Sequence, residues 1–184
     1  MTIKGKGKYE PEGKAFVQDL ALSNARDLPT LIRWNERYGI RFLRISSEMF
    51  PFASHKTYGY TLDFAAEYLR EAGALAMQWG HRLTTHPGQF TQLGAQRFDV
   101  ANASVREIEY HAALMDGLAL TGQADKDAVM VLHVGGVYSD RNATVKRFKK
   151  NFRALPEKVA RRIVIENDDV VSAACAQNCP SAAC

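Results

Sequence analysis

The sequence predicts an α/β fold, a partial TIM (β/α) barrel with about four to five parallel strands and covering helices. Segments with apolar residues at helical spacing lie before and between short apolar segments, which is the alternation of βα units. No glycine-rich phosphate-binding loop follows a strand, which argues against a dinucleotide or P-loop fold. The four predicted strands are rich in aliphatic and β-branched residues, as buried parallel strands are: Gly39–Ser46, Arg82–His86, Ala128–Val134 and Arg162–Glu166.

Helices are predicted from apolar stripes and from the residues at their ends. A first helix is expected over Ala25–Tyr38, with Pro29 in its first turn. A second is expected to begin with Thr61 as its N-cap and to end near Gly80. Pro156 should kink or split the fourth helix. The third and fourth stripes consist of Val105, Ile108, Ala112, Met115 and Leu118, and of Phe148, Phe152, Leu155 and Val159.

Length and composition suggest one globular unit with a short tail at each end. The chain has 184 residues, 46% of them hydrophobic, and no apolar run long enough to cross a membrane. We expect a basic tail over residues 1–14, the barrel unit over 15–169 and a tail over 170–184. The last tail holds all three cysteines, whose spacing is neither a disulfide framework nor a usual zinc pattern. A net charge of +4 is compatible with an anionic partner without requiring one.

Polar residues stand at the ends of the predicted strands. His86 ends the second strand, His133 lies near the end of the third, and Glu166 ends the fourth. The strand ends of a parallel barrel meet on one face, where two imidazoles and a carboxylate can hold a divalent metal ion. Such an ion can activate water and neutralise phosphate oxygens in phosphodiester hydrolysis. A single histidine near a strand end is more often a hydrogen-bonded structural residue, so the pattern leaves both interpretations open.

Other residues have a functional and a structural interpretation. Gln89 and Phe90 pair an amide with an aromatic ring in a loop, which suits insertion into a base stack or an ordinary turn. The basic residues Lys146, Arg147, Lys149 and Lys150 suit a solvated helix face or a phosphate backbone. We interpret His111 as a packing residue within a helix and His81 as a surface residue.

Four blocks of sequence resemble the signature blocks of the ultraviolet-damage endonucleases, most of all the fungal members: Arg44–His55, Thr85–Phe90, Leu132–Gly136 and Ile165–Asp169. The resemblance extends from about Phe16 to Asp169. It implies a TIM-barrel enzyme related in fold to endonuclease IV, with up to three divalent ions, usually Mn²⁺. Such enzymes nick double-stranded DNA immediately 5′ to ultraviolet photoproducts during repair.

The resemblance also implies roles for individual residues. His86, His133 and Glu166 would be metal ligands, with Glu166 bridging two ions at the catalytic centre. His55 would be a catalytic-groove residue near a DNA phosphate or metal-bound solvent. Gln89 and Phe90 would probe the duplex at the lesion. The partner would be ultraviolet-damaged double-stranded DNA, with no membrane and no small-molecule cofactor involved.

The resemblance does not cover the whole family pattern. The opening strand of the family and its later strands, which carry further metal ligands, have no counterpart here. We therefore expect a chain truncated at both ends that retains the ligands of about one ion. This leaves two alternatives open: an inactive remnant or weak DNA-binding fragment, and another barrel metalloenzyme such as an abasic-site endonuclease. DNA repair implies the nucleus of a eukaryote, with the mitochondrion as a second location, or the cytoplasm otherwise. The sequence predicts no oligomeric state.

Overall fold

The computed structural model describes residues 11–137 and 140–166. Its four strands form one sheet in sequence order, and every neighbouring pair is parallel. This is the strand arrangement of a (β/α) barrel, so the predicted fold class is confirmed. Within the described residues the sheet is open, with the first and last strands at its edges. The strands are β1 (Phe42–Ile45), β2 (Arg82–Thr85), β3 (Met130–Leu132) and β4 (Ile163–Ile165).

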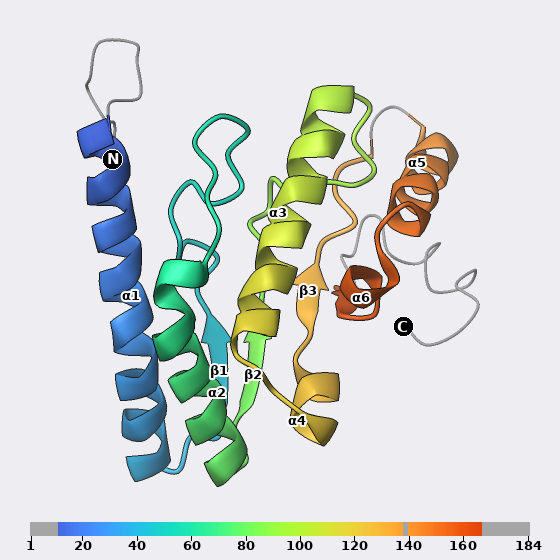
Figure 1. Cartoon of the computed structure of the whole chain (residues 1–184). Coiled ribbons are helices and arrows are strands. Elements are labelled where there is room, and N and C mark those ends of the chain that lie inside the picture. Colours follow the sequence, from blue (N-terminus) through green and yellow to red (C-terminus); the bar gives the residue numbers. More distant parts are fainter. Residues whose placement is uncertain (1–10, 138–139, 167–184) are drawn as a thin grey trace.

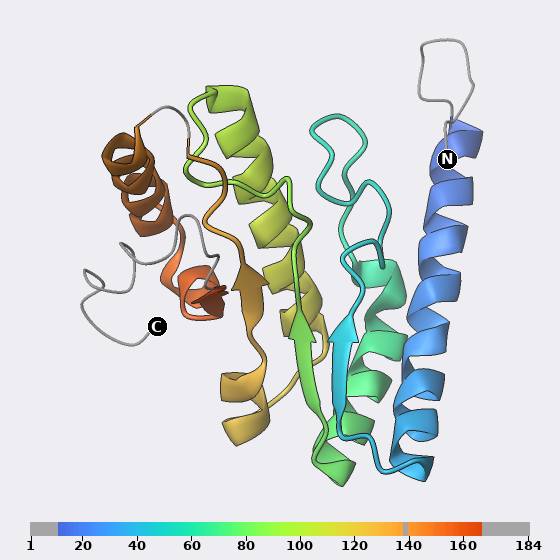
Figure 2. The same ribbon diagram turned by 180° about the vertical axis from the view of Figure 1, so that it is seen from behind.

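Helices cover one face of this sheet. In Figure 1, α2 (Ala66–Trp79) and α3 (Phe98–Gly117) lie in front of the strands, and α1 (Pro11–Arg37) lies beside α2 at the left of the sheet. From behind, β1, β2 and β3 have no helix in front of them among the described elements (Figure 2). The remaining elements are α5 (Arg141–Arg153) and three short ones: η1 (Asp63–Ala65), α4 (Gly122–Asp127) and α6 (Glu157–Ala160).

The core lies between the sheet and its helices. Alternate strand residues point to the helices, and Leu83, Met130 and Ile163 are fully buried there. The intervening residues point to the uncovered face, where Phe42 and Arg44 of β1 are exposed. One buried cluster joins β1 to α1 and α2, and a second joins β3 and β4 to α3 and α5. This two-residue alternation decides which strand-end side chains lie on the open face.

The first helix is longer than predicted. It begins at Pro11 rather than Ala25, so its first residues belong to the segment that we expected to be a tail. Pro29 therefore lies inside the helix and not in its first turn, where its missing N–H leaves one intrahelical hydrogen bond unmade. Packing outweighs this local cost, because a continuous buried stripe follows the helix: Val17, Ala21, Ala25, Leu28 and Ile32.

The ends of the other helices agree only partly with the prediction. Thr61 is not an N-cap: its hydroxyl donates to the Asp63 carboxylate at 2.7 Å, and the chain enters α2 through the 3₁₀ turn η1. Gly80 does end α2, in the left-handed conformation with φ of 69°. Pro156 separates α5 from α6, as expected for a residue without an N–H.

We predicted that His111 is a packing residue and that His81 lies on the surface, and one of these two predictions is correct. His111 is fully buried in α3, which confirms its packing role. The surface assignment of His81 is wrong, because the residue is 4% exposed. Its Nε2 lies 2.9 Å from Glu36 of α1, and this hydrogen bond lowers the pKa of Glu36. Glu36 lies near the C-terminal end of α1, so the last turns of this helix pack beside the residue that precedes β2.

No helix among the described residues is both long enough and apolar enough to cross a membrane. The predictions for the cysteines at 175, 179 and 184 and for most of the two tails concern residues outside the described ranges.

Candidate metal centre

His86, His133 and Glu166 each directly follow the last residue of a strand, namely β2, β3 and β4. The preceding residues Thr85 and Leu132 are buried toward the helices. Side chains alternate between the faces of a strand, so the next residue of each strand points to the open face. The parallel pairing of β2, β3 and β4 then brings the three side chains together.

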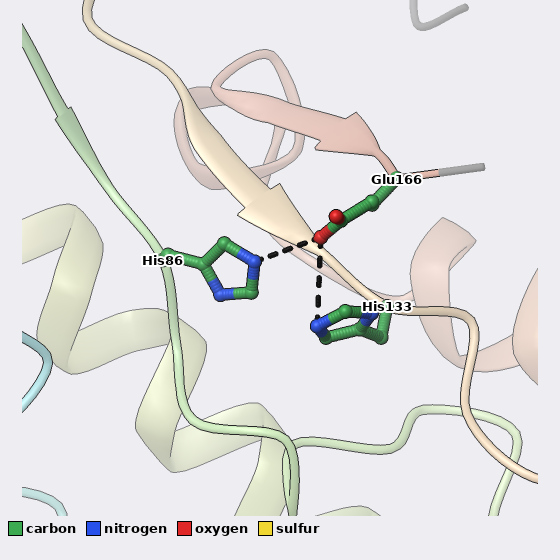
Figure 3. Close-up of side chains that lie close together, drawn as sticks. All are labelled: His86, His133 and Glu166. Carbon is green, nitrogen blue, oxygen red and sulfur yellow. Dashed lines mark hydrogen bonds and ion pairs between the residues drawn. The ribbon is translucent and has the colours of Figure 1, made fainter. Parts of the chain in front are cut away.

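The three side chains converge on one carboxylate oxygen (Figure 3). The Nε2 atom of His86 lies 2.8 Å from Oε2 of Glu166, and the Nε2 atom of His133 lies 3.5 Å from the same oxygen. All three ligand atoms lie within 4.8 Å of one another. Ligand atoms held at about 2.1 Å from one ion are roughly 3 to 3.4 Å apart, so these separations suit a shared ion. The residues form a candidate metal-binding group.

The hydrogen bonding of His86 also favours the binding of a cation between this residue and Glu166. Its Nδ1 lies 3.1 Å from the carbonyl oxygen of Pro87, which can only accept, so Nδ1 carries the ring proton. In the neutral ring Nε2 then presents a lone pair to an oxygen of Glu166 that also presents lone pairs. Two acceptors at 2.8 Å repel unless a proton or a cation lies between them. A histidine that donates its other N–H to a backbone carbonyl is the usual arrangement of a metal ligand.

His55 lies in the loop between β1 and η1, outside this group of three. Its Nδ1 accepts from the backbone N–H groups of Thr57 and Tyr58, at 3.1 and 3.2 Å. Its exposed ring stacks on Tyr58 with centroids 4.6 Å apart. Because Nδ1 is an acceptor, the proton of the neutral ring is on Nε2, which makes that atom a donor.

The His55 loop is held by side chains of α3. Arg106 donates from Nε to the Ser54 carbonyl at 3.1 Å, and the Tyr110 hydroxyl accepts from the Phe50 N–H at 3.2 Å. Burial raises the pKa of Tyr110, so the phenol stays protonated at neutral pH. Burial also acts to raise the pKa of Glu107, but hydrogen bonds from His111 and Ser54 outweigh it and lower that pKa overall.

Gln89 and Phe90 form the exposed tip of the loop between β2 and α3. The ring of Phe90 is 82% exposed, which is unusual for so large an apolar side chain. A turn closes the tip, since the Thr91 N–H donates to the Gly88 carbonyl at 2.8 Å. A groove of about 460 Å³ connects Phe90 with His55. The structure thus places these two predicted residues around one hollow.

Sequence reasoning missed the residues that hold these loops. They are Arg106 and Tyr110 for the His55 loop, and Ser104, Arg147 and Asn151 for the Phe90 loop. Most of their partners are backbone atoms of loops, which no side-chain pattern reveals. The basic cluster of α5 gave a partial signal, but we assigned Arg147 to a solvated or phosphate-binding face with its neighbours.

The fold and the group of three residues define a class: a parallel α/β domain of barrel type, with a candidate metal-binding group where its strands end. The chain belongs to the UV-endonuclease UvdE family, whose sequence model matches residues 2–176. This confirms the resemblance seen in the signature blocks.

Several relatives agree with this assignment. The UV-damage endonuclease of Neurospora crassa is 54% identical over 168 residues, which are 91% of this chain and 26% of the relative. The UV-damage endonuclease of Schizosaccharomyces pombe is 45% identical, over 86% of this chain and 26% of the relative. The crystal structure of SacUVDE superposes with a TM-score of 0.80 at 32% identity, over 94% of this chain and 56% of the other. The chain therefore spans about a quarter of these fungal relatives and about half of SacUVDE.

Proposed function

We propose that this chain provides metal ligands and duplex-probing residues of an endonuclease that nicks double-stranded DNA immediately 5′ to ultraviolet photoproducts. The observation that carries the proposal is the convergence of His86 and His133 on one oxygen of Glu166 at the strand ends. Family membership supplies the reaction, since the relatives are named UV-damage endonucleases.

In this proposal His86, His133 and Glu166 would hold a divalent ion, taken to be Mn²⁺. A bound ion of this kind supplies Lewis acidity and positive charge to the phosphodiester. Both histidines contact Oε2 of Glu166, so the carboxylate stands between the two imidazoles. The backbone carbonyl of Pro87 keeps the His86 ring oriented by accepting its Nδ1 proton.

Residues of the groove would bind the DNA. The Nε2–H group of His55 is a donor on the surface, suited to a phosphate oxygen. Phe90 would enter the base stack beside Gln89, because an exposed aromatic ring at a loop tip can separate neighbouring bases. We place the protein in the nucleus on the grounds of its fungal relatives and this substrate.

The test is incision of an end-labelled duplex that carries one cyclobutane dimer, in the presence of Mn²⁺. The proposal predicts a nick immediately 5′ to the dimer that disappears with His133→Ala or after removal of metal. Glu166→Gln should abolish the nick as well, whereas Glu157→Gln, its matched control, should keep it, because Glu157 is an exposed carboxylate on α6. Folded protein that leaves the dimer duplex intact, or that nicks equally well with His133→Ala, would contradict the proposal.

A further inference from the structure

The loop that carries Phe90 has two parts with different surroundings. The tip turn, closed by the hydrogen bond from Thr91 to Gly88, projects into solvent. The following part is a second turn, in which the Ala95 N–H donates to the Gln92 carbonyl at 3.1 Å. This second turn is buried: Leu93 lies fully inside the core cluster that also contains Phe148 of α5. The exposed tip therefore stands on a packed base.

Helix α5 holds that base through two hydrogen bonds to its backbone. The Asn151 side-chain amide donates to the Leu93 carbonyl at 2.7 Å, and Nε of Arg147 donates to the Gly94 carbonyl at 3.0 Å. Arg147 also donates from Nη2 to the Thr144 hydroxyl at 2.9 Å, which fixes its guanidinium against its own helix. Figure 1 shows the loop passing beside α5 at the upper end of α3.

The backbones of the loop and α5 also approach closely. A Cβ atom on Gly94 would lie 2.9 Å from Cγ2 of Thr144 and 3.3 Å from its carbonyl oxygen, so only glycine fits without displacement. On the other side of the base, the Gln92 N–H donates to the Ser104 hydroxyl of α3 at 2.7 Å. Helices α3 and α5 thus hold consecutive residues of the loop.

We propose that Arg147 and Asn151 are positioning residues for the Gln89–Phe90 tip. Separating stacked bases costs free energy. A ring on a mobile loop would lose additional conformational freedom on insertion, whereas a fixed base presents the ring already oriented. Arg147 thereby has a different role from its neighbours Lys146 and Lys150, whose side chains are exposed. The inference rests on the proposed function, because it concerns the residue that would probe the duplex.

The variants separate hydrogen bonding from charge. Asn151→Ala removes one donor, and Arg147→Lys keeps the positive charge but loses the planar group that reaches Gly94 and Thr144 together. Gly94→Ala disturbs the same contact from the side of the loop. Lys146→Ala and Lys150→Ala are the matched controls, since they remove charge from α5 without touching the loop base.

The first measurement is hydrogen exchange of the loop amides in the full chain. Asn151→Ala and Arg147→Lys are expected to speed exchange in residues 86–97 by about tenfold, with no comparable change in α2. The two lysine variants should exchange like the wild type. Unchanged exchange in both positioning variants would show that α5 does not hold the loop, and would overturn the proposal whatever the activity of the chain.

The second measurement is the ratio of dissociation constants for an undamaged and a dimer-containing duplex. Asn151→Ala and Arg147→Lys are expected to lower this ratio at least fivefold, and to lower it no further when Phe90→Ala is already present. The lysine variants should weaken binding to both duplexes equally. A ratio that is unchanged despite faster loop exchange would also overturn the proposal. A wild-type chain that shows no preference for the damaged duplex would instead refute the proposed function, while the exchange data still report on the loop.

Discussion

The Tyr110 hydroxyl offers a quantitative test of how α3 holds the His55 loop. Tyr110→Phe removes one oxygen and leaves the ring packing intact, including its edge contact with Phe50 at 6.3 Å between centroids. The Phe50 N–H, which donates to that oxygen at 3.2 Å, would then be buried without a partner. Such a group costs about 1 to 3 kcal/mol.

We therefore expect Tyr110→Phe to lower the free energy of unfolding by about 1.5 kcal/mol, measured by chemical denaturation. The Phe50 amide should also exchange faster with solvent. Tyr38→Phe is the matched control, because the Tyr38 ring is 59% exposed at the end of α1 and its loss of a hydroxyl should cost little. A Tyr110→Phe protein as stable as the control, with a protected Phe50 amide, would refute the assignment of this hydrogen bond.

Three further predictions concern stability and DNA recognition. Asp125→Asn should destabilise the fold by about 2 kcal/mol in denaturant, because it removes one of the two carboxylates that pair with the buried Arg162, the other being that of Asp116. Hydrogen bonds from Arg161 and then Arg162 lower the pKa of Asp125 in the folded protein. The stability that Asp125 contributes is therefore present above its unfolded pKa of about 4 and is lost as the pH falls through the lower folded value. Thermal melts of the wild type and Asp125→Asn should converge in acid. Phe90→Ala should change the melting temperature little, since the ring is exposed, yet reduce the preference for damaged duplex at least tenfold in competition binding; equal preference would exclude a probing role. Gly73→Ala should destabilise the protein by about 3 kcal/mol or leave it unfolded by circular dichroism, because the new Cβ would overlap the Leu118 carbonyl oxygen. Wild-type stability would contradict the close packing of α2 on the end of α3.

The sequence predicted most of the sheet and the meeting of His86, His133 and Glu166. Both predictions rest on simple periodicities: apolar residues mark a parallel strand, and the residue after it lies at a known edge of the sheet. The same reasoning gave strands that extend a few residues beyond the observed ones, because the pattern does not record where the ladder of hydrogen bonds stops.

The first half of α1, the burial of His81 and the holders of the loops were not predicted. The start of α1 is polar on one side and has small apolar residues on the other, and this pattern did not predict a helix. His81 is buried beside Glu36, near the end of α1 that was predicted, and this contact joins residues 45 positions apart that no local pattern connects. Arg147 and Asn151 contact backbone carbonyls that are distant in sequence, and such contacts follow from tertiary structure alone.

The central claim is that His86, His133 and Glu166 together hold a metal ion. The most direct measurement is a calorimetric titration of the metal-free wild-type chain with Mn²⁺, repeated with Glu166→Gln and with the exposed control Glu157→Gln. We expect the wild type and the control to bind Mn²⁺ alike, and Glu166→Gln to bind it at least tenfold more weakly. Equal binding by all three folded proteins, or no binding by the wild type, would contradict the central claim.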